Sequence, residues 1–206
     1  MTTGRGFSVV SRETTAALDA YRALLIAWGQ RLNLVSKAEL SPEALTAHIE
    51  DSLSLVPYLP PGLDRFIDIG SGGGLPAVPI ALATRVHADL IEADRRKAAF
   101  LQTALAKLDA PGTVWRERIE TTQAPPARCV TARALAPLDK LLDLAHPLLA
   151  PAGCALFLKG PQVHDEVEIA RRRWHMEAEV FDGFEPRSKI LKITDLRPSY
   201  VSGSAP

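Results

Sequence analysis

The sequence predicts an α/β fold with a mostly parallel sheet, a helical extension before it and an antiparallel last strand. Three observations predict this fold: helix-like apolar spacing over about the first 60 residues, alternating strand-like and helix-like segments from residue 63 onward, and a glycine-rich loop after the first predicted strand. Such alternation produces a parallel sheet with helices on both faces, and an antiparallel last strand is common there. We divide the chain into an extension, 1–62, and a main domain, 63–206.

Two helices are predicted in the extension. The second begins at Ser41-Pro42-Glu43, which supplies an N-cap residue, a proline in the first turn and an acid near the positive end of the helix dipole. Prolines and Gly62 then break the chain over 57–62. The first helix begins near Ser11, and its apolar face consists of Leu18, Tyr21, Leu25, Trp28 and Leu32.

The main domain is predicted as alternating elements. Strands are expected over 65–69, 88–92, 113–116, 129–132 and 154–158. Helices are expected from about Leu75, and over 95–108, 137–149 and 163–174. A closing hairpin is expected from 178–184 and 190–194, joined through 186–188.

Composition predicts an ordinary soluble protein, with 47% hydrophobic and 23% charged residues. The longest uncharged apolar stretch, 75–83, is too short to cross a bilayer, and the N-terminus lacks an apolar core of signal-peptide length. We therefore expect a cytoplasmic protein without membrane contact. Two cysteines, Cys129 and Cys154, are too few for a disulfide scaffold or a cysteine zinc cage. Basic and acidic residues number 24 each, which argues against coating nucleic acid by charge alone but permits a local basic face.

The strongest functional signal is the segment 68–76, Asp-Ile-Gly-Ser-Gly-Gly-Gly-Leu-Pro, between a predicted strand and a predicted helix. Glycines allow backbone to approach a ligand closely, and open α/β sheets bind ligands at the carboxyl ends of their strands. A dinucleotide fingerprint would need glycine where Leu75 stands, and the lysine of a P-loop is absent, so a dehydrogenase is disfavoured.

S-adenosylmethionine fits the same segment better, because this cofactor carries a sulfonium and an ammonium group but no phosphate. Asp68, just before the glycines, suits a cationic cofactor. Glu92, at the end of the second predicted strand, is placed to accept hydrogen bonds from ribose hydroxyls. The alternative is a glycine turn that merely packs a helix on a strand.

Five segments in order resemble the bacterial small-subunit ribosomal RNA guanine-N7 methyltransferases, also called glucose-inhibited division protein B. The resemblance runs from about Asn33 to Thr194. The chain departs from the family pattern at Ala47, where arginine is frequent, and at Ala127-Arg128, where Phe-Asp is frequent. The segments are Asn33-Leu34 with 48–53, FIDIGSGGGLPAVP at 66–79, Arg96-Lys97 with Phe100-Leu101, Arg133-Ala134, and Leu158-Lys159-Gly160.

The resemblance implies a class I, Rossmann-like S-adenosylmethionine-dependent methyltransferase that uses no metal. It implies methylation of a guanine N7 in the decoding-region hairpin of 16S ribosomal RNA, within the small ribosomal subunit. We expect a monomer, since no coiled coil or exposed apolar helix is predicted. The family's cofactor contacts map onto Gly70, Leu75, Ile119, Glu120 and Arg133, and our own reading adds Gly72 and Glu92.

Methyl transfer to guanine N7 needs positioning rather than a general base, because N7 has a free lone pair and no proton to lose. Arg133 and Lys159, at the ends of the fourth and fifth predicted strands, are the candidate catalytic cations. We expect Arg133 to hold the methionine carboxylate or an RNA phosphate, and Lys159 to hold the RNA backbone or the guanine O6 edge. The alternatives are a surface ion pair for Arg133 and a solvated side chain for Lys159.

Several interpretations remain open at this point. His48 and Asp51 share one helix face and either reach the cleft or tie the extension to the main domain. RNA contact is favoured for 95–97, whereas a solvated helix face is favoured for 171–173. Two other function classes compete: a small-molecule methyltransferase on the same fold, and a non-catalytic module that binds the cofactor or RNA.

Overall fold

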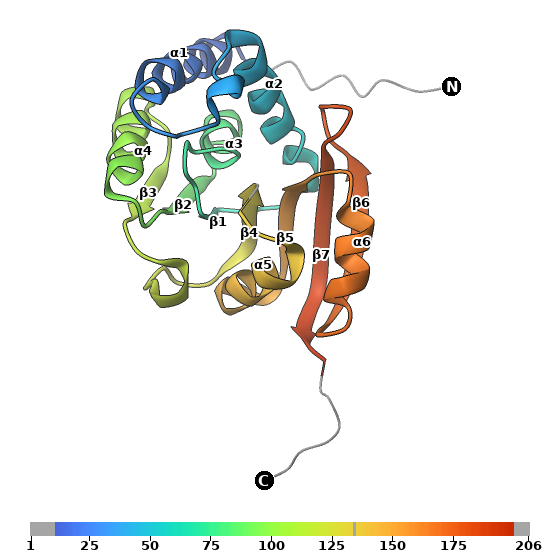
Figure 1. Ribbon diagram of the computed structural model, residues 1–206. Coiled ribbons are helices and arrows are strands. Elements are labelled where there is room, and N and C mark those ends of the chain that lie inside the picture. The colour runs from blue at the N-terminus through green and yellow to red at the C-terminus, as the bar shows by residue number, and fades with distance from the viewer. Residues whose placement is uncertain (1–10, 134, 200–206) are drawn as a thin grey trace.

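A seven-stranded sheet with the order β3-β2-β1-β4-β5-β7-β6 forms the centre of the computed structural model (Figure 1). The structure describes residues 11–133 and 135–199. Residues 1–10, which belong to the N-terminal segment where no signal peptide is expected, and Ala134, which belongs to the segment Arg133-Ala134, therefore lie outside the described residues. The strands are β1 Arg65–Ile69, β2 His87–Ile91, β3 Gly112–Trp115, β4 Ala127–Arg133, β5 Leu149–Lys159, β6 Trp174–Asp182 and β7 Lys189–Pro198.

The first five strands are parallel, and β7 is antiparallel to both of its neighbours. The predicted α/β fold with an antiparallel last strand is therefore confirmed, with β7 inserted between β5 and β6. Strand order reverses between β1 and β4, which is the point where open α/β sheets leave a crevice for ligands.

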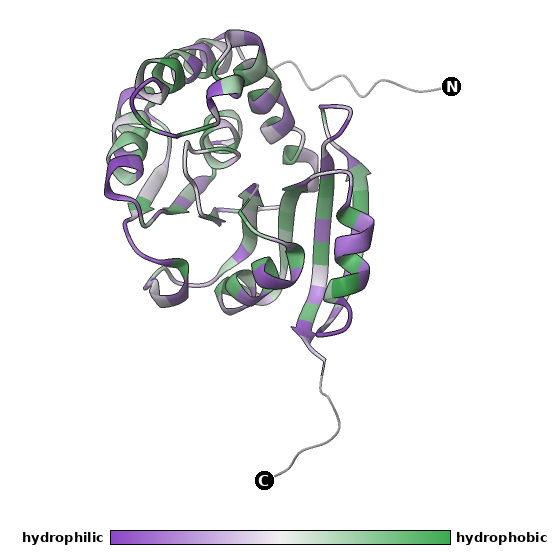
Figure 2. Cartoon of the chain, viewed as in Figure 1, coloured by the Kyte–Doolittle hydropathy of each residue, from purple (hydrophilic) through white to green (hydrophobic). Residues whose placement is uncertain are grey.

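Helices cover both faces of the sheet (Figure 1). They are α1 Arg12–Gly29, α2 Pro42–Leu53, α3 Ala77–Thr84, α4 Arg95–Leu108, α5 Leu138–Ala145 and α6 Val163–Ala170. Buried side chains of α1 to α4 form one hydrophobic cluster with one face of the sheet, and those of α5 and α6 form a second cluster with the other face. Figure 2 shows the corresponding pattern, with β5 mostly hydrophobic and α6 divided between hydrophilic and hydrophobic residues.

Side-chain caps explain where the helices begin. Ser11 Oγ accepts a hydrogen bond from Thr14 N at 3.2 Å, and Ser41 Oγ accepts one from Ala44 N at 3.2 Å. Asp94 caps α4 twice, because its Oδ1 accepts from the backbone N–H groups of residues 96 and 97 at 2.8 and 2.9 Å. Such caps satisfy backbone donors that have no partner within the first helical turn.

The helical extension packs directly on the main domain. Tyr21 of α1 is fully buried, and its hydroxyl donates a 2.6 Å hydrogen bond to the backbone oxygen of Gly73 in the glycine loop. A Cβ added at Gly73 would lie 3.1 Å from Leu34 O and 3.3 Å from Leu25 Cδ2. The predicted extension is thus in contact with the predicted ligand loop, while the boundary near residue 62 stays a prediction.

Several predicted boundaries differ from the structure. The helix expected over 137–149 spans Leu138–Ala145, and the hairpin strands expected over 178–184 and 190–194 span Trp174–Asp182 and Lys189–Pro198. Strand β5 begins at Leu149 rather than 154, because a register shift against β4 accommodates Pro151, which has no N–H to donate. The helix predicted over 163–174 ends at Ala170, and Trp174 already begins β6. Helix α3 begins at Ala77 rather than near 75. No helix within 11–133 or 135–199 is long and apolar enough to span a membrane.

Candidate active site

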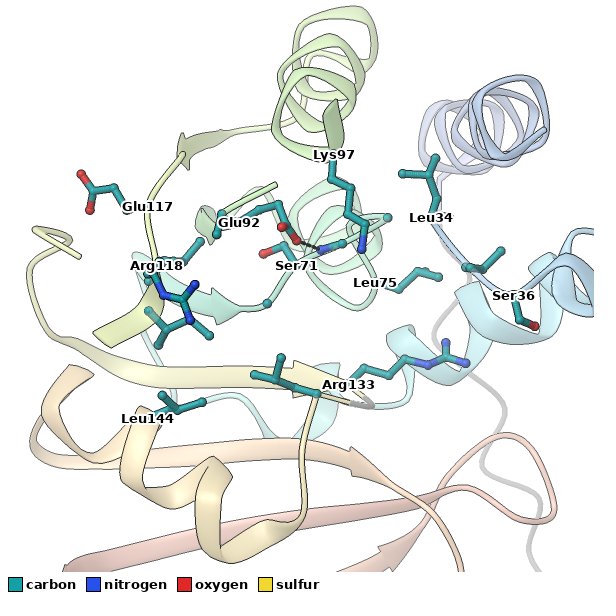
Figure 3. A pocket seen from close by; sticks show the side chains of 18 of the residues that line it. Leu34, Ser36, Ser71, Leu75, Glu92, Lys97, Glu117, Arg118, Arg133 and Leu144 are labelled. Atoms are coloured by element: carbon teal, nitrogen blue, oxygen red, sulfur yellow. Dashed lines mark hydrogen bonds between the residues drawn. The ribbon is translucent and has the colours of Figure 1, made fainter. Parts of the chain in front are cut away.

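A cavity of about 600 Å³ lies at the carboxyl ends of the central strands (Figure 3). It is bordered by the loop after β1, the end of β2, the first turn of α4, the segment after β3 and the end of β4. The extension contributes Leu34, Val35, Ser36, Glu39 and His48. In Figure 3 the labelled Arg118 and Leu144 lie at one end, and Leu34 and Ser36 lie at the other. The other lining residues are Gly70, Ser71, Gly72, Gly73, Leu75, Ile91, Glu92, Ala93, Lys97, Glu117, Ile119, Glu120, Arg133 and Leu135.

The glycine loop takes a backbone course that L side chains rarely adopt. Gly70 has φ +66°, and a Cβ there would lie 2.5 Å from Leu135 Cδ1. Gly72 has φ +53°, and a Cβ there would meet no described atom closer than Gly70 O at 3.8 Å. Hydrogen bonds from the N–H groups of Gly70 and Ser71 to Ile91 O, at 3.0 and 3.1 Å, hold the loop on β2. The loop therefore presents bare backbone to the cavity.

Glu92 fixes the loop from the end of β2. Its Oε2 accepts a 2.8 Å hydrogen bond from Gly72 N, drawn in Figure 3, and its Oε1 accepts one of 2.8 Å from Asp94 N. The side chain borders the cavity although the residue is only 9% exposed. Each carboxylate oxygen has further acceptor capacity, so the group can also take hydrogen bonds from a ligand.

Asp68 lies beneath the loop and does not line the cavity. Its Oδ1 accepts a 2.7 Å hydrogen bond from Thr131 Oγ1, whereas Oδ2 has no partner among the residues that the structure describes. Burial disfavours the charged carboxylate and raises the pKa of Asp68 to about 7. The predicted role of Asp68 beside a cationic cofactor stays a prediction.

Arg133 and His48 meet at the cavity wall, although 85 residues separate them. The distance from Arg133 Nη2 to His48 Nδ1 is 2.7 Å, and since a guanidinium only donates, Nδ1 accepts this hydrogen bond. Two carboxylates flank the same ring: Glu185 Oε1 lies 3.0 Å from Nδ1, and Glu39 Oε1 lies 3.3 Å from Nε2. The predicted cavity residue Arg133 is therefore tied to His48 of the extension, and Glu185 of the turn between β6 and β7 lies against the same ring.

Asp51 contacts that same turn. Its Oδ1 accepts a 3.0 Å hydrogen bond from Phe184 N, and its Oδ2 accepts one of 2.8 Å from Ser188 Oγ. Both interpretations of the pair are thus realised: His48 lines the cavity, whereas Asp51 ties α2 to the β6–β7 turn.

Lys159 is placed differently from the other predicted site residues. Its ammonium group lies 2.7 Å from Glu166 Oε2 and donates a 3.1 Å hydrogen bond to Ala136 O. The residue does not line the cavity, in contrast to Gly70, Gly72, Leu75, Glu92, Ile119, Glu120 and Arg133, which all do. The functional roles of these eight residues stay predictions.

Other candidate groups lie away from the cavity. Cys129 and Cys154 face each other on β4 and β5, and a hydrogen bond with Cys154 together with burial raises the pKa of the Cys129 thiol. Arg171 and Arg173 are exposed and pair with Glu168 at 3.2 Å and Asp143 at 2.9 Å. No group of three or more potential metal ligands lies together in the described part of the chain.

The structure adds residues that local patterns did not assign to the site. Glu117 and Arg118, which follow β3, are such residues, whereas Lys97, which extends from α4 toward the glycine loop, belongs to the segment 95–97 for which RNA contact is predicted (Figure 3). Within the cavity lining, four carboxylates accompany three cationic side chains and several aliphatic ones. Such a mixed, acid-rich lining suits a ligand that carries positive charge and hydroxyl groups, rather than a pyrophosphate.

Comparisons with solved structures show the fold. A ribosomal protein L11 methylase from Lactobacillus delbrueckii superposes with a TM-score of 0.57 at 14% identity, covering 70% of this chain and 76% of that one. A magnesium protoporphyrin IX methyltransferase from Synechocystis, solved with bound S-adenosylmethionine, gives 0.57 at 12% identity and covers 91% and 99%. The fold is that of the class I methyltransferases, as predicted.

Comparisons of sequence show the family. The family model described as rRNA small subunit methyltransferase G matches residues 14–186. A ribosomal RNA small subunit methyltransferase G from Acidiphilium cryptum is 47% identical over 193 residues, which cover 92% of this chain and 89% of the relative. The protein of the same name from Gluconobacter oxydans is 42% identical over 191 residues, covering 92% and 98%. The glycine-loop cavity thus lies in a chain that belongs to the rRNA small subunit methyltransferase G family.

Proposed function

We propose that this protein transfers a methyl group from S-adenosylmethionine to N7 of a guanine in 16S ribosomal RNA. One observation carries the proposal: the cavity at the strand-order reversal combines bare glycine backbone, Glu92 and Arg133, in a chain that matches the family over 14–186. The proposed substrate is the RNA of the small ribosomal subunit, and the enzyme acts as a cytoplasmic monomer.

The residues around the cavity fit S-adenosylmethionine. Gly72 leaves space that a larger side chain would fill, and its N–H is already held by the Glu92 carboxylate. Glu92 would accept hydrogen bonds from the ribose hydroxyls, and Ile119 and Glu120 would border the adenine. Arg133 would bind the carboxylate of the methionine part, because His48 occupies only one of its nitrogens and Nη1 has no partner among the described residues.

When bound, S-adenosylmethionine supplies a methyl group on a positively charged sulfur. The chain's own task is positioning, because guanine N7 offers a lone pair directly and no proton has to be removed. The glycine loop and Leu75 would set the direction of approach, and the aliphatic residues of the extension would exclude water from the cavity. Methylation gives the guanine positive charge, so we place Arg133 and Lys159 away from N7.

Lys159 has a separate proposed role. Its bonds to Glu166 and Ala136 O hold the segment that follows β4, next to Leu135 of the cavity wall. We infer that Lys159 acts on the RNA side of the reaction, toward the RNA backbone or the guanine O6 edge, without contributing to cofactor affinity.

The test is methylation of small ribosomal subunits from a strain that lacks the gene. Purified protein and labelled S-adenosylmethionine are added, and the modified nucleoside is identified and mapped by mass spectrometry of the digested RNA. We expect one 7-methylguanosine in 16S RNA from wild type and none from Gly72→Asp. Label on an exocyclic amine or a ribose oxygen of the RNA, or no label on the RNA at all, would overturn the proposal.

A further inference from the structure

We propose that Phe184, in the turn between β6 and β7, stacks on an unpaired base of the RNA substrate next to the target guanine. The inference rests on the proposed function, because it assigns part of the RNA-binding surface of that enzyme. Nothing in the cofactor cavity requires Phe184, which does not line it.

Exposure is the first observation. Among the residues that the structure describes, two large hydrophobic side chains are exposed: Ile169 at 51% and Phe184 at 50%. Ile169 lies on α6 and Phe184 in a turn. An exposed ring leaves its faces open to a ligand, and what distinguishes Phe184 from the equally exposed Ile169 is the position of its turn beside a cavity-lining residue.

Position is the second observation. Strand β6 is parallel to β5, because β7 is antiparallel to both, so Asp182 at the end of β6 lies at the same sheet edge as Lys159. Both residues pair in register with Lys189. The turn 183–188 therefore projects from the edge where the cavity lies, and Figure 1 shows it beside α2.

Contacts of the turn bring it to the cavity wall. Glu185 follows Phe184 directly, and its Oε1 lies 3.0 Å from Nδ1 of His48, a cavity-lining residue. An RNA strand whose guanine enters the cavity would pass this turn with the neighbouring nucleotide. Exposed Arg187 lies in the same turn and offers a positive charge for the RNA backbone.

Rigidity is the third observation. Asp51 accepts hydrogen bonds from Phe184 N and from Ser188 Oγ, and Gly183 N donates to Ser188 O at 3.0 Å. A Cβ at Gly183 would lie 2.7 Å from Asp51 Oδ1, so the turn fits closely against that carboxylate. A ring on a fixed backbone loses little conformational freedom when a base stacks on it. Stacking on aromatic side chains is a common way for proteins to hold unpaired RNA bases.

The experiment compares wild type, Phe184→Ala, Phe184→Trp and Ile169→Ala. Methylation rates are measured at varied concentrations of small ribosomal subunits, and cofactor affinity is measured by calorimetry. For Phe184→Ala we expect kcat/KM for the subunit to fall by about 5- to 150-fold, the range for loss of one stacked base. Phe184→Trp should retain activity, Ile169→Ala should match wild type, and all four proteins should share one cofactor Kd and one Tm.

The outcomes separate this inference from the proposed function. If wild type methylates 16S RNA and Phe184→Ala does so with the same kcat/KM, the stacking role is wrong and the proposed function stands. If wild type transfers no methyl group to RNA, both are wrong. Weakened cofactor binding in Phe184→Ala would also overturn the inference. The inference would also be wrong if Phe184→Ala methylated small subunits more slowly than wild type but bound protein-free 16S RNA as tightly, because the ring would then contact a ribosomal protein.

Discussion

Asp68 should make the stability of the protein fall as the pH rises. Its carboxyl is 1% exposed, one oxygen has no hydrogen-bond partner among the described residues, and burial raises its pKa from an ordinary 3.8 to about 7. Between these values the unfolded chain ionises while the folded protein keeps the proton. The folded state therefore binds more protons, and the free energy of unfolding decreases with pH.

The size of this effect follows from the two pKa values. The stabilisation by Asp68 is fully present below about pH 4, decreases by about 1.4 kcal/mol per pH unit, and has gone above about pH 7. The total is about 4 kcal/mol, an order-of-magnitude figure. Asp68→Asn keeps an oxygen for Thr131 and cannot ionise, so it should lack this component.

The assay is urea unfolding of cofactor-free protein at several pH values from 5 to 8.5, with Asp68→Asn compared with wild type at each. We expect the variant to gain stability relative to wild type as the pH rises, with the gain levelling off above about pH 7. Thr131→Val is the matched control. It removes the hydrogen-bond donor that favours the charged carboxylate, so the pKa of Asp68 in the folded protein should rise, and the decrease in unfolding free energy should continue to a higher pH than in wild type. Parallel profiles for wild type and Asp68→Asn would refute the reasoning.

Three further predictions concern the proposed site residues. Gly72→Asp should abolish S-adenosylmethionine binding in calorimetry, because a side chain and a negative charge enter beside Glu92; unchanged binding, or tight NAD binding by wild type, would contradict the cofactor assignment. Glu92→Ala should raise the cofactor Kd by about 5- to 150-fold, the loss of hydrogen bonds to a charged group, with the fold retained by circular dichroism; an unaltered Kd would make the acid merely structural. Arg133→Ala should raise the cofactor Kd in calorimetry, whereas Lys159→Ala should lower the rate of RNA methylation and leave the cofactor Kd unchanged. Equal increases of the cofactor Kd in both variants would disprove the division of roles.

Local signals were sufficient for much of the fold. Helix α4 spans 95–108 as predicted, because the Asp94 cap and the spacing of its apolar residues both lie within the segment. The sequence predicts β5 too short, because Pro151 interrupts the local strand pattern. The register shift that accommodates this proline arises only when β5 pairs with β4. Tertiary pairing therefore decided the boundary that the sequence pattern placed wrongly.

The site divides in the same way. The glycine loop and Glu92 could be located from residues 68–92 alone, because a strand, an acid and glycines occur in a fixed order. The contact between His48 and Arg133 could not, since 85 residues separate them and no local period relates them. Leu34 and Glu39 line the cavity because the extension folds over it, which depends on packing between distant helices.

The close packing of the first helix against Gly73 has a consequence for the evolutionary drift of this chain. Because Leu25 and Leu34 O leave little room at Gly73, a replacement there would be tolerated only after a matching change in the first helix. Tyr21 bonds a backbone oxygen that any residue at 73 would keep, so the coupling falls on the side chain of Leu25, and positions 25 and 73 should change together or not at all among descendants of this sequence. Recombination that exchanged the first helix alone would separate residues that have to be inherited as one set.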